Sequence, residues 1–88
     1  MSYQVRLSSR AVKDLDRVGR DTRERMLQRL DRIAEAPHDP RLSSSLTAKG
    51  GLRKSRVGGW RIIFTVEDDI RVVAVVTIDR RGQVYQRI

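Results

Sequence analysis

The spacing of apolar residues changes near residue 49 of this 88-residue chain, and this change constrains the fold more than any other feature. Upstream, after a short alternating segment at the N-terminus, apolar residues recur three and four positions apart, as they do in amphipathic helices. Downstream they alternate with polar residues or run together, as they do in β-strands. Helices followed by a run of strands predict an α+β fold, in which a helix hairpin packs on a twisted, mainly antiparallel sheet.

The predicted element order is β-α-α-β-β-β-β. Ser8 or Ser9 is expected to cap the first helix, and Gly19 is expected to end it. A capping box at residues 21–24 begins the second helix, which ends before Pro37. Residues 37–48 are rich in turn formers and predict a loop. The predicted strands are 3–7, 51–57, 60–66, 83–88 and the apolar run 70–78, which we expect in the centre of the sheet with both faces covered.

Length and composition limit the class of protein. The chain fits one domain, residues 1–88, with one modest core. It has no cysteine and one histidine, which excludes a disulfide scaffold and the usual zinc sites, so we expect no metal and no cofactor. No run approaches the roughly 18 apolar residues of a membrane span, and the N-terminus lacks an apolar signal segment. We therefore expect a soluble, cytoplasmic protein.

The net charge of +8 comes from sixteen Arg and three Lys against eleven acidic residues. The arginine side chain offers a flat, permanently charged fork that suits phosphate oxygens and stacks on bases. A small domain this basic is typical of proteins that bind nucleic acid. The alternative is a soluble protein from a GC-rich genome, in which Arg replaces Lys for reasons unrelated to binding.

The glycine pair at 58 and 59 predicts a two-residue, type I′ hairpin turn, which sets the register of its two strands. This register places Arg56 opposite Arg61, with Lys54 on the same face, and turns the alternate apolar residues toward the helices. Like charges placed opposite one another destabilise a sheet, and residues 49–61 hold five cations and no anion. We therefore expect this face to bind an anion such as a phosphate backbone; a solvated basic face is the alternative.

The next candidates follow the apolar strand. A two-residue turn at Asp68-Asp69 places Arg61 opposite Val76, so Arg80 and Arg81 are expected near the same end of the sheet. Tyr85 offers a ring for stacking on a base, or it packs in the core. His38 lies far from these cations in the sequence and is not favoured as a general base. The acidic pair predicts hairpin chemistry rather than a magnesium site.

Three segments resemble the RelE/ParE toxin superfamily of bacterial toxin–antitoxin systems. They are YQVRLSSRAVKDLDRV, GLRKSRVGGWRIIFTV and VVAVVTIDRRGQVYQRI, and together they span nearly the whole chain. The resemblance implies the RelE-like, microbial-ribonuclease type of fold. In its ribonuclease branch it implies a toxin that cleaves mRNA on the ribosome without a metal, through attack of the ribose 2′-OH on the adjacent phosphate.

The resemblance also implies the site residues. The expected catalytic residues are Lys54, Arg61, Arg81 and Tyr85, and the expected RNA-binding residues are Arg53, Arg56 and Arg80. Lys54 is the expected acceptor of the 2′-OH proton, the two arginines stabilise the charge of the transition state, and the tyrosine donates to the 5′-oxygen or stacks on a base. Asp79-Arg80 stands where members of this branch have Gly-His, so a histidine base is missing.

Two other functions remain open on the same scaffold. A gyrase inhibitor of the ParE branch acts by binding a topoisomerase and does not cleave RNA. A plain RNA-binding module binds RNA with a strong salt dependence and leaves it intact. Either toxin implies a cognate antitoxin, whose C-terminal segment is expected to fold against this domain.

Overall fold

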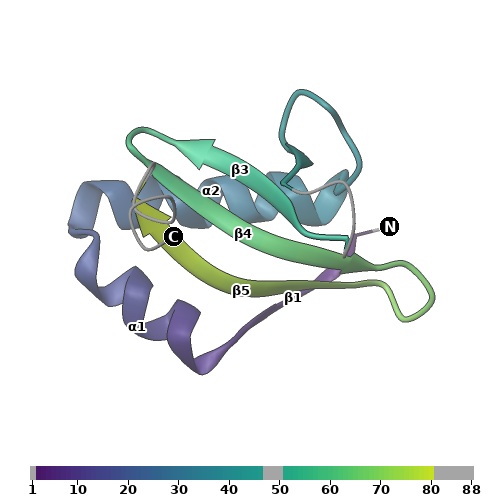
Figure 1. Ribbon diagram of the computed structural model, residues 1–88, viewed down its shortest axis with the longest axis horizontal. Coiled ribbons are helices and arrows are strands. Elements are labelled where there is room, and N and C mark those ends of the chain that lie inside the picture. The colour runs from purple at the N-terminus through teal and green to yellow at the C-terminus, as the bar shows by residue number, and fades with distance from the viewer. Residues whose placement is uncertain (1, 47–50, 81–88) are drawn as a thin grey trace.

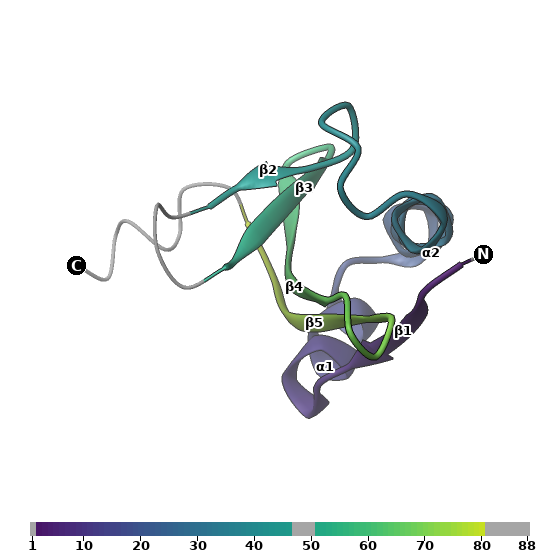
Figure 2. The same cartoon turned by 90° about the vertical axis from the view of Figure 1, so that its right-hand side faces the viewer.

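The computed structural model describes residues 2–46 and 51–80 and confirms the α+β fold. Two helices pack on a five-stranded sheet with the order β1-β5-β4-β3-β2 (Figure 1). β1 runs parallel to β5, and the other neighbouring strands are antiparallel. The sheet is strongly twisted, and α2 lies beside it, seen nearly end-on in Figure 2. The elements are β1 (Gln4–Leu7), α1 (Ser9–Arg17), α2 (Arg20–Glu35), β2 (Ser44–Ser45), β3 (Arg53–Val57), β4 (Trp60–Glu67) and β5 (Val72–Arg80).

The first helix begins as its sequence predicts. Ser8 is the N-cap of α1, and its Oγ accepts a hydrogen bond from the backbone N–H of Ala11 at 3.0 Å. The same hydroxyl donates to the carbonyl oxygen of Val76 on β5 at 2.6 Å. One serine therefore both caps the helix and ties its N-terminus to the sheet.

The second helix begins two residues earlier than predicted. Gly19 is the N-cap of α2, with φ at 89°, and makes no side-chain capping bond. The predicted capping box at residues 21–24 is therefore wrong, because Asp21 already lies in the first turn, where its charge suits the helix dipole. The end of α2 at Glu35, before Pro37, is confirmed.

The hairpin between β3 and β4 has the predicted register. Arg56 pairs with Arg61 and Lys54 with Ile63. The turn type differs, because only the first of the two glycines, Gly58, has positive φ, at 60°. Type I′ requires positive φ at both central residues, and this pattern is that of type II′.

β2 is a strand that the sequence did not predict. Ser44 and Ser45 lie in the expected loop and pair with Lys54 and Arg53 on the outer edge of β3. A two-residue strand of serines carries no apolar alternation, so periodicity had no signal to detect. The predicted strand 83–88 lies outside the described residues.

β5 starts two residues later than predicted, and its pairing with β4 is shifted. The turn spans four residues, since Glu67 pairs with Val72, and Arg71 in it has φ at 54°. An extra residue, Val76, then bulges between the pairs on either side of Ile63 and Phe64. Arg61 consequently pairs with Asp79, so the predicted pairing with Val76 is wrong. The bulge also leaves Val76 44% exposed, so β5 lies between two strands but is not covered along both faces.

One apolar cluster joins both helices to one face of the sheet. The predicted inward positions on the hairpin are confirmed: Phe64 and Ile62 are fully buried, and Trp60 packs against them. On α2, the apolar residues Met26, Leu30, Ile33 and Ala34 are buried, whereas Leu27 is 43% exposed. None of the described helices is long and apolar enough to cross a membrane. The cluster consists of Ala11, Leu15, Val18, Met26, Leu30, Ile33, Leu42, Val57, Ile62, Phe64, Val73, Val75 and Ile78.

Candidate nucleic-acid interface

The alternation of β3 separates the three cations that it carries. Lys54 and Arg56 point to the sheet face away from the helices, and Arg56 is exposed. Arg53 points the other way and is held by the loop before β2, with Nε 3.0 Å from Ser43 Oγ and Nη2 3.3 Å from the Ser43 carbonyl. Arg53 therefore supports the loop, and its RNA-binding role stays a prediction. Lys54 and Arg56 share the outer face of β3, as the alternation predicts.

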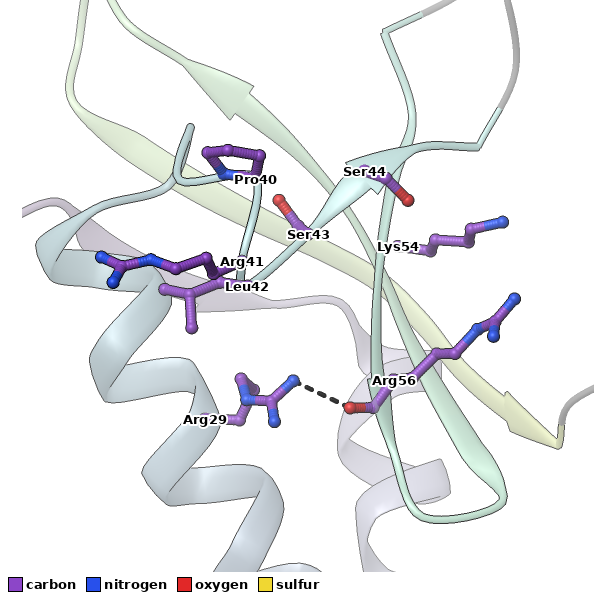
Figure 3. A pocket seen from close by; sticks show the side chains of 8 residues that line it. All are labelled: Arg29, Pro40, Arg41, Leu42, Ser43, Ser44, Lys54 and Arg56. Atoms are coloured by element: carbon purple, nitrogen blue, oxygen red, sulfur yellow. Dashed lines mark hydrogen bonds between the residues drawn. The ribbon is translucent and has the colours of Figure 1, made fainter.

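Lys54 and Arg56 border an open groove of about 500 Å³ between β3, the end of α2 and the loop that leads into β2. Their side chains point in the same direction, away from Arg29 and Arg41 (Figure 3). No carboxylate is among the lining residues that the structure describes. The lining consists of Arg29, Pro40, Arg41, Leu42, Ser43, Ser44, Lys54 and Arg56.

Arg29 fixes β3 against α2 at the base of this groove. Its Nη1 donates to Ser55 Oγ at 2.8 Å. The same Nη1 donates to the Arg56 carbonyl, also at 2.8 Å (Figure 3). The Ser55 hydroxyl, 1% exposed, donates in turn to the Leu42 carbonyl at 2.7 Å. Sequence analysis missed this role of Arg29. A serine at an inward position of β3 is the available signal, because a buried hydroxyl requires a partner.

Arg61 is buried and paired, unlike the exposed cation that its sequence position predicts. It is 3% exposed, and its Nε and Nη2 lie 3.1 and 3.3 Å from the two carboxylate oxygens of Asp79. The longer β4–β5 turn and the Val76 bulge place this carboxylate opposite Arg61. The predicted pairing of Arg56 with Arg61 is confirmed. The Asp79 carboxylate reduces the repulsion between these two arginines. The expectation that Arg61 faces an outside anion beside Arg56 is therefore wrong for this structure.

Comparison with known proteins gives the family. The model of the ParE toxin of type II toxin–antitoxin systems (parDE) matches residues 5–85. The chain belongs to this family. A RelE-like toxin protein of Escherichia coli is 25% identical over 81 residues, which cover 92% of this chain and 85% of the relative. The resemblance to the RelE/ParE superfamily is thus confirmed.

Solved structures of this toxin superfamily share the fold. A double mutant of E. coli toxin RelE in the free state is 26% identical, with a TM-score of 0.79 over 98% of this chain and 93% of that chain. The RelBE2 toxin–antitoxin complex of Mycobacterium tuberculosis superposes with a TM-score of 0.80 at 20% identity, over 92% of this chain and 100% of the matched chain. The present chain is a toxin of this type II superfamily.

Two further predicted site residues, Arg81 and Tyr85, lie outside the described residues, and their catalytic roles stay predictions. Arg80 is the last described residue, and it pairs with Trp60 on the helix-facing side of the sheet. Its guanidinium carbon lies 5.1 Å from the centre of the Trp60 ring. Arg80 therefore lies near the same end of the sheet as Arg56, as predicted, but on the opposite face from Lys54 and Arg56. Its RNA-binding role stays a prediction.

His38 of the toxin lies outside the groove. Its Nε2 is 2.8 Å from Asp68 Oδ1, which also accepts a hydrogen bond from the Tyr3 hydroxyl at 2.7 Å. The bond to His38 is the main cause that lowers the pKa of Asp68, and the bond to Asp68 raises the pKa of Tyr3. Within residues 2–46 and 51–80 no group of three potential metal ligands occurs.

Proposed function

We propose that this toxin acts in the cytoplasm as a metal-independent endoribonuclease that cleaves mRNA on the ribosome and is neutralised by a cognate antitoxin. The observation that carries the proposal is the pair Lys54 and Arg56, which project together beside a groove whose described lining holds no carboxylate. The relatives support the partner, because the M. tuberculosis and E. coli neighbours are toxin–antitoxin complexes.

The proposed chemistry breaks one bond and forms one. The ribose 2′-oxygen attacks the adjacent phosphorus, the bond from phosphorus to the 5′-oxygen breaks, and the products are a 2′,3′-cyclic phosphate and a 5′-OH. Lys54 accepts the 2′-OH proton, and Tyr85 donates a proton to the leaving 5′-oxygen. Arg56 and Arg81 stabilise the extra negative charge of the pentavalent phosphorus. We assign Arg61 a supporting role, because Asp79 already occupies its guanidinium.

The test is a translation reaction with defined mRNA, purified ribosomes and EDTA-treated toxin. We expect Lys54→Ala and Arg56→Ala each to lower the cleavage rate by about a hundredfold or more, within the range attributed to acid–base and electrostatic groups. Lys13→Ala, which removes a cation from α1, is the matched control and is expected to cleave normally. The Arg81→Ala and Tyr85→Phe variants test the two remaining roles.

Unchanged cleavage by both the Lys54→Ala and Arg56→Ala variants would reject the proposed site. Cleaved ends that lack the cyclic phosphate would reject the proposed chemistry. RNA that binds strongly but stays intact with and without ribosomes would leave a binding module as the function.

Gyrase inhibition is a second candidate, and one observation favours it. Arg61 was expected to stabilise the transition state of RNA cleavage, but it is paired with Asp79. Asp79-Arg80 also stands where the ribonuclease branch has Gly-His, so no histidine is present there. A supercoiling assay with purified gyrase discriminates the two functions. Inhibition of supercoiling together with intact mRNA on ribosomes would establish the gyrase inhibitor and exclude the nuclease.

A further inference from the structure

A second basic surface lies on α2, next to the groove. Arg25, Arg29 and Arg32 are spaced at i, i+4 and i+7, so they occupy one side of the helix. They line a smaller cavity of about 170 Å³ together with Gln28 and Val57. Arg29 belongs to this cavity and to the larger groove, so the two are continuous. We call Arg25, Arg29, Arg32, Lys54 and Arg56 the α2–β3 strip.

The cations of the strip lie close together, and none of them forms an ion pair with a carboxylate of the described residues. The ion pairs in the described part of the chain use Arg10, Arg23, His38, Arg41 and Arg61, and none uses a residue of the strip. Neither cavity has an aspartate or glutamate among its described lining residues. The strip ends at Arg41, whose guanidinium binds Asp39 at 2.9 Å. Together with Arg41, Arg32 is close enough to Asp39 to help lower the pKa of that carboxyl, so the charge of Arg32 is partly compensated. The other positive charges border two adjoining cavities and create a local potential that attracts a polyanion.

Hydrogen bonds within the toxin hold Arg29 of the strip in place, and Arg25 lies beside the hairpin turn. Arg29 is fixed by its two 2.8 Å hydrogen bonds to β3. The guanidinium of Arg25 lies over the hairpin turn, 3.6 Å from the position that a Cβ on Gly58 would take. A group held by hydrogen bonds, as Arg29 is, loses less conformational entropy when a ligand binds than a freely rotating side chain does.

The chemistry of the strip favours a phosphate backbone over an acidic protein segment. Protein partners anchor on apolar side chains, yet the large apolar side chains exposed in the described residues, Val12, Leu27, Ile70 and Val76, belong to neither cavity. Arginine forks match phosphate oxygens, and phosphate contacts need no apolar anchor. We propose that the α2–β3 strip binds the backbone of a single-stranded RNA segment flanking the one in the groove.

The test uses a fluorescein-labelled, single-stranded 2′-O-methyl RNA, which lacks the attacking hydroxyl and stays intact. The inference deepens the proposed function, and this probe separates binding from cleavage. We compare wild-type toxin with the Arg25→Gln/Arg32→Gln variant by fluorescence anisotropy across a range of salt concentrations. Arg20→Gln/Arg23→Gln, which makes the same charge change on the opposite side of α2, is the matched control.

We expect the Arg25→Gln/Arg32→Gln variant to lose RNA affinity and the control variant to keep most of it. Removing two phosphate contacts lowers the slope of log K against log salt by about 1.4, and it weakens binding on the order of tenfold at moderate salt. The control is expected to shift either quantity by less than half as much. Thermal melts that match wild type in both variants exclude a folding defect.

Equal effects of the two double variants would overturn the proposal, as would wild-type toxin that fails to bind this RNA. Loss of affinity for a polyglutamate peptide with RNA binding retained would reassign the strip to an acidic protein partner and also overturn it. These outcomes are distinguishable from failure of the nuclease proposal. If the Arg25→Gln/Arg32→Gln variant cleaves mRNA normally, only the proposed RNA binding by the strip is rejected. If the wild-type toxin binds RNA through the strip but cleaves no mRNA, only the nuclease proposal is rejected.

Discussion

The buried pair of Arg61 and Asp79 makes a quantitative prediction about stability. Asp79→Asn keeps the shape of the side chain and removes its charge, so a guanidinium that is 3% exposed loses its anionic partner. Breaking a buried ion pair by removing one partner costs about 3–5 kcal/mol. The lower end applies here, because Asp79 is 15% exposed and the two contacts, at 3.1 and 3.3 Å, are long for charged hydrogen bonds. We expect a loss of about 3 kcal/mol, which lowers Tm by about 12–24 °C in a domain of this size.

Urea denaturation of four proteins tests this reasoning. They are the wild type, Asp79→Asn, Arg61→Met and the double variant, which together form a double-mutant cycle. We expect a coupling energy of at least about 1 kcal/mol, since the double variant removes both members of the ion pair. Asp16→Asn is the matched control: it breaks an exposed pair with Arg23 at 3.7 Å and is expected to cost less than about 0.5 kcal/mol. A cost below about 1 kcal/mol for Asp79→Asn, or additive single effects, would refute the argument.

Three further predictions concern the helix ends and the turn. Ser8→Ala is expected to cost about 1–2 kcal/mol in urea denaturation, because it removes both the cap and the bond to the Val76 carbonyl, whereas exposed Ser9→Ala costs less than about 0.5 kcal/mol. Gly19→Ala, at φ 89°, is expected to cost about 1–2 kcal/mol, and Gly59→Ala, with open space and no positive φ, very little; equal costs would contradict this. The carboxyl of Asp68 is expected to titrate in NMR spectra below its ordinary pKa, and His38→Ala is expected to raise that pKa. Because the pKa of Asp68 is lowered in the folded state, its contribution to folding stability is present above about pH 4 and is lost as the pH falls through the folded pKa. An Asp68 pKa that does not move in His38→Ala would show that His38 is not the cause of the lowered pKa.

Local chemistry in the sequence predicts most of the toxin's fold. The two periodicities gave the helices and the main strands, and the glycine pair gave the register of Arg56 with Arg61. Prediction from the sequence was wrong where the register between β4 and β5 decides which residues pair. The turn before β5 has four residues rather than two, and the bulge at Val76 adds one more, so every later residue of β5 meets a different partner. Neither feature has a signal in apolar spacing, because both depend on packing with distant residues.

The same limit applies to the candidate site. Lys54 and Arg56 share a face because strand alternation alone requires it. Asp79 reaches Arg61 only through the shifted register, so inspection of the hairpin could not reveal that pairing. Arg29 joins the groove because α2 crosses β3, a contact between residues 26 positions apart in the chain. Charge counting finds the basic surface, but tertiary contacts decide which of its cations are left without carboxylates.

The parallel pairing of β1 with β5 determines when the newly made toxin can complete its sheet. Val5 pairs with Val73, so the first strand to leave the ribosome waits for a partner 68 positions later. At a synthesis rate of about 5–20 residues per second, this wait lasts roughly 3–14 seconds. During that interval α1 lacks β5, the strand on which it mainly packs. A nascent chain interrupted before residue 72 therefore cannot form the β1–β5 pairing of this fold.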